Sequence, residues 1–385
     1  MSYYRCVGKI PKTRHTQFRQ PSGAIYHEEM LTTAGFDGLS SLLYHVSPPT
    51  IVQSIKAQPP VRVEAHNDDV LRHHRFQTLG LQRAGDFLTA RTPLFFNDDV
   101  VLSLCTPERP SEAFYRNGEC DELVYVHEGT GEMLTPFGSL AYRANDWVYI
   151  PRGTTVEWVP KAGGERLFVI ESVTDIRPPS RYLNQFGQFL EASPYCERDM
   201  RGPEYREPVE GSGSFEVRVK ARDLVTSFWL EHHPFDVVGW DGCFYPYAIN
   251  AFDFQPIVQS IHTMPNVHQI FATGNAAICN LIPRPADFHP DAIVAAPNHA
   301  SVDCDEVLYI LGGKLAGRVG DGPGTTTFHP RGIPHGPKPG MYEKSIGNTR
   351  HEGLALMVDT FRTLKIAAPA MECDDPTYPS AWTGG

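Results

Sequence analysis

Short apolar runs separated by turn-forming residues dominate the pattern of hydrophobic and polar positions along the chain. The clearest runs are 100–104 (VVLSL), 122–126 (ELVYV), 147–150 (WVYI) and 307–311 (VLYIL). They are rich in β-branched and aromatic residues and too short for typical helices, so each predicts a β-strand. The 33 glycines and 33 prolines supply the turns that many short strands require. The pattern therefore predicts an all-β protein with extra loops and short helices.

An internal repeat relates the two halves of the chain. Cys-Asp-Glu, two aliphatic residues and Tyr occur at 120–125 and again at 304–309. Pro-Arg-Gly follows each copy, at 151–153 and at 330–332. Two copies of one hairpin, in the same order, predict two barrels of common ancestry.

The length of 385 residues suits two packed cores rather than one. We expect an N-terminal lead segment over residues 1–60, an N-terminal barrel over 61–230 and a C-terminal barrel over 231–385. A Pro-rich, polar stretch at 176–235 is the expected connector between the barrels.

The second copy of the repeat carries a candidate metal site, formed by His299, Glu306 and His335. Two imidazoles and one carboxylate suit a divalent metal and leave coordination positions open for substrate. Glu306 opens a β-prone run that ends at Gly312 and Gly313, which predicts a strand and a tight turn. The later Pro-Arg-Gly turn is expected to deliver His335 onto a second, antiparallel strand, so that all three side chains meet inside the barrel.

The first copy keeps the carboxylate, Glu122, and lacks both imidazoles. Val156 stands at the position of His335, and Tyr115, with Asn117 nearby, stands by spacing at the position of His299. One carboxylate holds a transition metal poorly. We therefore expect the N-terminal barrel to be structural, with its metal site lost.

Charge and composition exclude several classes of function. The net charge is -11 and no basic tail or long Lys/Arg run is present, which argues against a nucleic-acid partner. A small anionic substrate would need a local basic group against this overall field. The eight cysteines form no C-x-x-C pair and indicate free thiols in a reducing compartment. No signal core and no run of about 18 apolar residues is found, so we expect a cytoplasmic protein without a membrane partner.

Five segments together resemble the homogentisate 1,2-dioxygenase family: HPFDVVGWDG at 233–242, His262 in SIHTMP, His299, Glu306, and PHGP at 334–337. The resemblance covers most of the chain and is that of a short member of the family. It implies a bicupin fold, with two double-stranded β-helix (jelly-roll) barrels. Six residues separate His299 from Glu306 here, where the family usually has five.

The resemblance also implies roles for individual residues. His299, Glu306 and His335 would hold a mononuclear Fe(II), and His262 would be the catalytic acid/base group near a substrate hydroxyl. His329 would contact substrate or lie behind the ligands, and His335 would also face the substrate. The side-chain pKa of histidine lies near neutrality, which suits the role given to His262.

These expectations describe an Fe(II)-dependent, extradiol-type ring-cleaving dioxygenase. Its partners would be O₂ and a small para-dihydroxy aromatic acid, with homogentisate converted to maleylacetoacetate in tyrosine and phenylalanine catabolism. Family members tend to form trimers and hexamers, so a homo-oligomer is expected. Three alternatives stay open: the same chemistry on gentisate or a substituted hydroquinone, a zinc hydrolase, and a non-enzymatic bicupin. The basic residue that would bind the substrate carboxylate also stays open.

Overall fold

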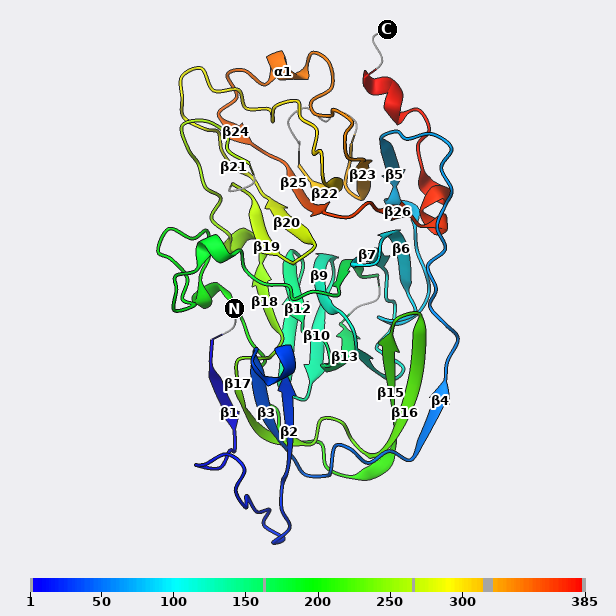
Figure 1. Ribbon diagram of the computed structural model, residues 1–385, viewed down its shortest axis with the longest axis vertical. Helices are drawn as coiled ribbons and strands as arrows, with labels where there is room; N and C mark the ends of the chain where they lie inside the picture. Colours follow the sequence, from blue (N-terminus) through cyan, green and yellow to red (C-terminus); the bar gives the residue numbers. More distant parts are fainter. Residues whose placement is uncertain (1–2, 162–163, 265–266, 314–320, 383–385) are drawn as a thin grey trace.

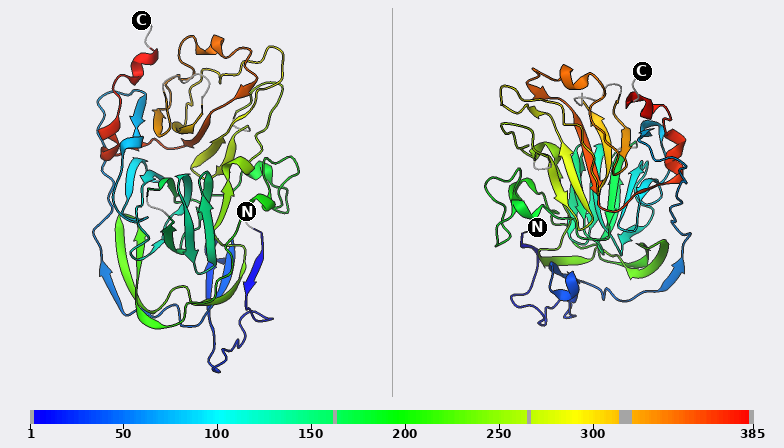
Figure 2. Two further views of the ribbon diagram at one scale, coloured as in Figure 1. Left: turned by 180° about the vertical axis from the view of Figure 1, so that it is seen from behind. Right: turned by 45° about the horizontal axis from the view of Figure 1, so that its top comes forward.

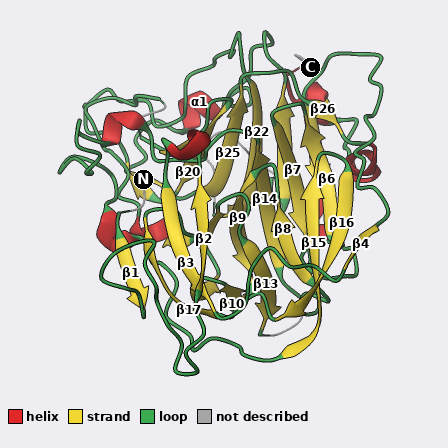
Figure 3. Ribbon diagram, turned by 60° about the horizontal axis from the view of Figure 1, so that its bottom comes forward, coloured by secondary structure: helices red, strands yellow, loops and turns green. Residues whose placement is uncertain are grey.

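The computed structural model describes residues 3–161, 164–264, 267–313 and 321–382 (Figure 1). Within these ranges the only α-helix is the four-residue α1 (Met341–Lys344), so the predicted all-β class is confirmed. Strands fill the body of the molecule and the short helices lie near its edges (Figure 3). The 3₁₀ turns are η1 (Ala34–Phe36), η2 (Thr78–Gly80), η3 (Ser180–Tyr182), η4 (Glu197–Asp199), η5 (Ala251–Asp253), η6 (Ala368–Cys373) and η7 (Tyr378–Trp382). No helix in the described ranges is long and apolar enough to cross a membrane.

Three large sheets build the two cupin units. The outer sheet has the order β11 (Gly138–Arg143), β10 (Thr130–Thr135), β13 (Thr155–Pro160), β8 (Phe114–Asn117), β15 (Ser212–Ala221), β16 (Leu224–His232), β4 (Ser54–Ala57). The central sheet has the order β18 (Tyr247–Asn250), β12 (Asp146–Ile150), β9 (Asp121–Glu128), β14 (Arg166–Ser172), β7 (Val100–Cys105), β6 (Arg91–Phe96), β26 (Lys365–Ile366). The C-terminal sheet has the order β19 (Gln269–Ala272), β20 (Ala276–Leu281), β25 (Leu354–Thr360), β22 (Asp305–Gly312), β23 (Thr325–His329), β5 (His74–Gln77). All four strands predicted above are present, as β7, β9, β12 and β22.

The central sheet is shared between two cores. On β9, Val124 and Val126 face the outer sheet, while Leu123 and Tyr125 face the C-terminal sheet. Successive side chains of a strand point to opposite faces, so a strand buried on both faces reads as a continuous apolar run. The outer and central sheets enclose the N-terminal barrel. The C-terminal sheet packs one face on the central sheet, and its other face carries the candidate site.

Strands cross between the two halves. The early strand β5 is hydrogen bonded to β23 in the C-terminal sheet, and the late strand β26 is hydrogen bonded to β6 in the central sheet. The C-terminal segment, red in Figures 1 and 2, accordingly lies beside the early strands β5 and β6. The division of the chain at residue 230 stays a prediction, because these pairings tie each half to the other.

The expected connector at 176–235 is wrong over its last third. Residues 212–232 form β15 and β16, two long strands of the outer sheet. The alternation Phe215, Val217, Val219 is typical of a half-buried strand, and the glycine- and serine-rich lead-in obscures it.

The segment HPFDVVGWDG anchors the lead segment to the fold. A small sheet has the order β1 (Arg5–Gly8), β17 (Val237–Gly242), β3 (Ser40–His45), β2 (His27–Thr32). At the end of β3, the buried His45 lies 2.7 Å from the Asp236 carboxylate and 3.1 Å from that of Glu29. Burial alone would lower the pKa of His45, but the two carboxylates outweigh it and raise the pKa to about 9. The motif therefore serves folding here, through a buried charge pair.

Because His45 is paired with two carboxylates, we expect the stability of the protein to depend on pH. The folded state holds the proton more tightly than the unfolded chain, where the pKa is about 6.5. The stabilisation should be complete below pH 6.5 and lost as pH rises through about 9, a change on the order of 3 kcal/mol in the free energy of unfolding. Urea unfolding at a series of pH values should show this slope in the wild type and lose it in His45→Gln. The exposed His15→Gln should keep it, and an unchanged slope in His45→Gln would contradict the assignment.

Candidate metal centre

Glu306 stands at the start of β22, on the face of the C-terminal sheet away from the core. Its neighbours Val307 and Tyr309 pack in the core shared with the central sheet, so Glu306 and Leu308 point to the opposite face. Across the sheet Glu306 pairs with His329 of β23 and with Asp359 of β25. Strand register thus fixes where the carboxylate lies.

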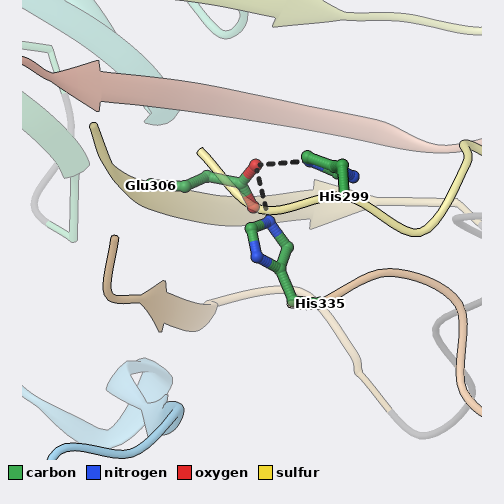
Figure 4. Close-up of side chains that lie close together, drawn as sticks. All are labelled: His299, Glu306 and His335. Atoms are coloured by element: carbon green, nitrogen blue, oxygen red, sulfur yellow. Dashed lines mark hydrogen bonds and ion pairs between the residues drawn. The ribbon is translucent and has the colours of Figure 1, made fainter. Parts of the chain in front are cut away.

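His299 and His335 reach Glu306 from two loops. The two residues form an isolated antiparallel bridge, with N–O distances of 2.9 and 2.8 Å. The expectation that His335 lies on a strand is wrong: the strand β23 ends at His329, before the turn, and the bridge to His299 holds His335 instead. The pairing places both rings beside the Glu306 carboxylate (Figure 4).

The donor atoms are arranged as a metal site requires. Nε2 of His335 and Nε2 of His299 lie 3.4 and 3.7 Å from Oε2 of Glu306, and one ligand atom from each of the three residues falls within 4.8 Å of the others. Nδ1 of His299 donates to the Pro297 carbonyl, and Nδ1 of His335 donates to that of Ile333. Each ring therefore presents its other nitrogen, Nε2, to the Glu306 carboxylate, and this is the atom that would coordinate a metal. Two imidazoles and a carboxylate fit Fe(II).

His329 supports Glu306 from behind. Its Nδ1 donates to Oε1 of Glu306 at 2.8 Å, and its ring stacks on His335 with centroids 4.4 Å apart. Burial alone would raise the pKa of Glu306, but hydrogen bonds from the three histidines hold it well below the usual range. His329 is buried, and neither it nor His335 is among the described residues that line the adjacent cavity. Substrate contact by His329 and His335 stays a prediction.

A cavity of about 330 Å³ extends from His299 and Glu306 over the open face of the C-terminal sheet. Its walls are mostly apolar, and its far end carries three histidines. The apolar lining includes Cys279, Leu281, Ile282, Val294, Leu308 and Met357. The histidines are His262, His268 and His351. A small, largely apolar ligand with a few polar groups matches such a cavity.

The predicted catalytic residue His262 lines the same cavity as the triad. Its Nδ1 lies 2.9 Å from Nη2 of Arg284, a guanidinium that can only donate. Nδ1 of His262 is therefore the acceptor, and the neutral ring carries its proton on Nε2. Burial, and then the charge of Arg284, lower the pKa of His262. Asp287 in turn accepts two hydrogen bonds from Arg284, at 3.3 and 3.1 Å.

Asp359 is a candidate functional residue that could not be identified from the sequence. It lines the cavity beside Glu306, and its buried Oδ1 has no hydrogen-bond partner among the described residues. Burial, and then repulsion from Glu306, raise the pKa of Asp359 to about 8. The internal repeat contains the signal, because Glu171-Ser172 in the first copy occupies the position of Asp359-Thr360 in the second.

The N-terminal barrel fills the equivalent position with a different network. Glu122 accepts from Tyr115 at 2.7 Å and from Asn117 at 3.1 Å, the residues that spacing places at the first histidine. Nη1 of Arg91 adds a third donor at 2.8 Å. Among the described residues, the three-ligand geometry occurs at His299, Glu306 and His335 alone.

The chain is similar in sequence to known proteins over its whole length. A protein named "Putative dioxygenase" from Saccharolobus solfataricus is 35% identical over 385 residues, which is 99% of each chain. A family profile described as "Homogentisate 1,2-dioxygenase N-terminal" matches residues 99–251. The chain belongs to the homogentisate 1,2-dioxygenase family. The resemblance stated from the sequence is thereby confirmed.

Two named members of the homogentisate 1,2-dioxygenase family align over part of the chain. The enzyme of Emericella nidulans is 23% identical over 254 residues, 63% of this chain and 56% of its own. That of Caenorhabditis elegans is 24% identical over 252 residues, 62% of this chain and 55% of its own. The aligned region thus spans just over half of each relative.

Among solved structures, a cupin 2 conserved barrel domain protein from Leptotrichia buccalis matches 78% of this chain and 99% of its own at 10% identity and a TM-score of 0.36. Protein Ylba from E. coli matches 75% and 90% at 11% identity and a TM-score of 0.37.

Proposed function

We propose that this protein is an Fe(II)-dependent dioxygenase that opens the ring of homogentisate to give maleylacetoacetate. The observation that carries the proposal is the triad of His299, Glu306 and His335, two of whose members, His299 and Glu306, line a small and mostly apolar cavity. The cavity of about 330 Å³ lies at the small end of the range for ligand sites, which suits one aromatic ring with short substituents.

Bound at this triad, Fe(II) would bring O₂ and the aromatic ring together and relay electrons between them, with both oxygen atoms entering the product. The histidine at the far end then acts on the other hydroxyl of a para-diol. With its proton on Nε2, His262 donates a hydrogen bond to a substrate oxygen rather than removing a proton from it. Arg284 positions His262 by holding this tautomer.

The described residues that line the cavity include no lysine or arginine that could pair with a substrate carboxylate. His268 and His351 are neutral at pH 7, since burial and the charge of Arg284 lower the pKa of His351 to about 4 and that of His268 well below the usual range. The metal is therefore the cation available to the carboxylate in the proposed complex. This favours a ligand with a carboxylate next to one phenolic hydroxyl, over an unsubstituted hydroquinone.

The experiment is an oxygen-uptake screen of the protein loaded anaerobically with iron. Homogentisate, gentisate and hydroquinone are supplied in turn, and products are identified by mass spectrometry. We expect O₂ uptake with homogentisate and a product heavier by two oxygen atoms. Turnover of gentisate alone would move the assignment to that acid, and bound zinc without O₂ uptake would overturn the oxygenase.

A further inference from the structure

The C-terminal segment contributes a side chain to the back of the metal centre. Tyr378 begins η7, and its side chain is buried. The Tyr378 hydroxyl oxygen lies 3.3 Å from Nε2 of His329, and Nδ1 of the same ring donates to Oε1 of Glu306 at 2.8 Å. Two hydrogen bonds in series thus connect Tyr378 with the carboxylate of the triad, through a ring that is contacted at both nitrogens.

The histidine in the middle of this connection occurs only in the barrel that carries the triad. His329 pairs with Glu306 across β22 and β23. In the N-terminal barrel, Ile150 pairs with Glu122 at the same place across β9 and β12. The side chain of Ile150 forms no hydrogen bonds, and Arg91 is one of the donors that Glu122 takes instead. A hydrogen-bonding side chain at this register therefore accompanies the triad, and the general cupin architecture does not require it.

Other contacts hold Tyr378 in place independently of His329. The backbone N–H of Asp375 donates to the Arg75 carbonyl at 2.7 Å, and the Asp375 carboxylate accepts from Nε of Arg75 at 3.2 Å. The guanidinium of Arg75 lies over the Tyr378 ring, 5.1 Å from its centroid. Arg75 belongs to β5, which pairs with β23, the strand of His329. A hydroxyl held by its own neighbours can restrain the ring that it meets.

We propose that Tyr378 is a positioning residue of the metal centre. Its hydroxyl fixes the rotation of the His329 ring, so that Nδ1 stays directed at Oε1 of Glu306. The other carboxylate oxygen, Oε2, is then left to face Nε2 of His299 and of His335. Partners behind a metal ligand orient it and raise the affinity for the metal. The inference rests on the proposed iron site and extends it to the C-terminal segment.

Titration of the metal-free, full-length protein with Co(II) tests the proposal, followed by the visible absorption of the bound ion. Tyr378→Phe keeps the ring and removes the hydroxyl, so we expect it to bind Co(II) about tenfold more weakly than the wild type. The matched control is Tyr245→Phe. Tyr245 is as buried as Tyr378, and its hydroxyl donates to the Tyr3 carbonyl at 2.8 Å in the lead segment. This variant should keep the wild-type affinity, even where both variants lose thermal stability.

A double-mutant cycle with His329→Asn separates positioning from packing. Asparagine keeps an amide N–H near the place of Nδ1 and has no atom at the place of Nε2. In this background, Tyr378→Phe should change the Co(II) affinity by less than about twofold, because the contact is already absent.

Two results would overturn the role of Tyr378 and leave the iron site standing. One is equal affinity in the wild type and Tyr378→Phe. The other is an undiminished loss on Tyr378→Phe in the His329→Asn background. A wild type that binds no Co(II) would overturn the metal centre itself, and this role of Tyr378 with it.

Discussion

His335→Ala is expected to lose iron binding and, with it, oxygen uptake. Nε2 of His335 is one of three donor atoms gathered within 4.8 Å, and a carboxylate with a single imidazole holds a divalent transition metal poorly. The fold should persist, because His335 lies in a loop that is attached to His299 by backbone hydrogen bonds. Iron content measured by atomic emission after gel filtration, beside a circular dichroism spectrum, checks both statements.

The matched control is His127→Ala. His127 is a half-buried histidine whose Nδ1 lies 2.7 Å from the Tyr309 hydroxyl. The Tyr309 side chain lies on the face of β22 opposite to Glu306. Its loss should leave the iron content near that of the wild type. Full iron occupancy in His335→Ala would show that His335 is not an iron ligand, and it would also refute the proposed oxygenase function.

The parts of the fold that sequence reasoning predicted are those set by local pattern. The runs at β9 and β22 are apolar without interruption because side chains on both faces of each strand are buried. In β22, Val307 and Tyr309 pack in the core shared with the central sheet, and Leu308 and Ile310 pack in a second cluster on the opposite face. In the structure the repeat extends beyond the strands. The buttress beneath each Pro-Arg-Gly turn is the same in both copies: Asp121 accepts from the backbone N–H and Nε of Arg152, and Asp305 accepts from those of Arg331.

Pairings between distant segments were beyond the reach of the sequence. The exchange of β5 and β26 between the halves joins strands about 250 and 270 residues apart, and no local pattern encodes such a partner. The bridge between His299 and His335 is of the same kind. Periodicity specifies that a residue faces inward, whereas register against a distant strand specifies which residue it meets.

The residues of the candidate metal centre also divide into those that the sequence identified and those that depend on pairing between distant segments. Residue type and order were enough to select His299, Glu306 and His335, which the structure brings together. Asp359 was missed because its place depends on pairing with Glu306, 53 positions earlier in the chain. The hydrogen bond from Arg284 that fixes the tautomer of His262 was missed for a related reason, since Arg284 lies 22 residues away with no shared motif. Their roles in catalysis remain proposals that kinetics can test.

His262→Ala is expected to keep its iron and to slow turnover by about 10²–10⁴-fold, the usual scale for the loss of a positioned acid/base group. His262 lines the cavity and is held by Arg284, away from the three ligand residues, so the metal content should not change. His262→Gln keeps a donor N–H and should recover part of the loss. Steady-state kinetics should place the effect on kcat more than on KM, because the hydrogen bond strengthens as charge develops on the substrate oxygen.

The pH profile separates this role from a packing role. In the wild type, part of the activity should depend on pH through protonation of the His262 ring, whose pKa is lowered by burial and then by Arg284. The variant His262→Gln has no ring to protonate and should lose this part of the pH dependence. His289→Ala, which removes an exposed histidine that is not among the described cavity-lining residues, is the control and should match the wild type. An undiminished rate in His262→Ala would assign His262 to the packing of the buried Arg284 and leave the hydrogen bond to the substrate oxygen to another group in the cavity, such as Asp359, whose buried Oδ1 has no hydrogen-bond partner among the described residues.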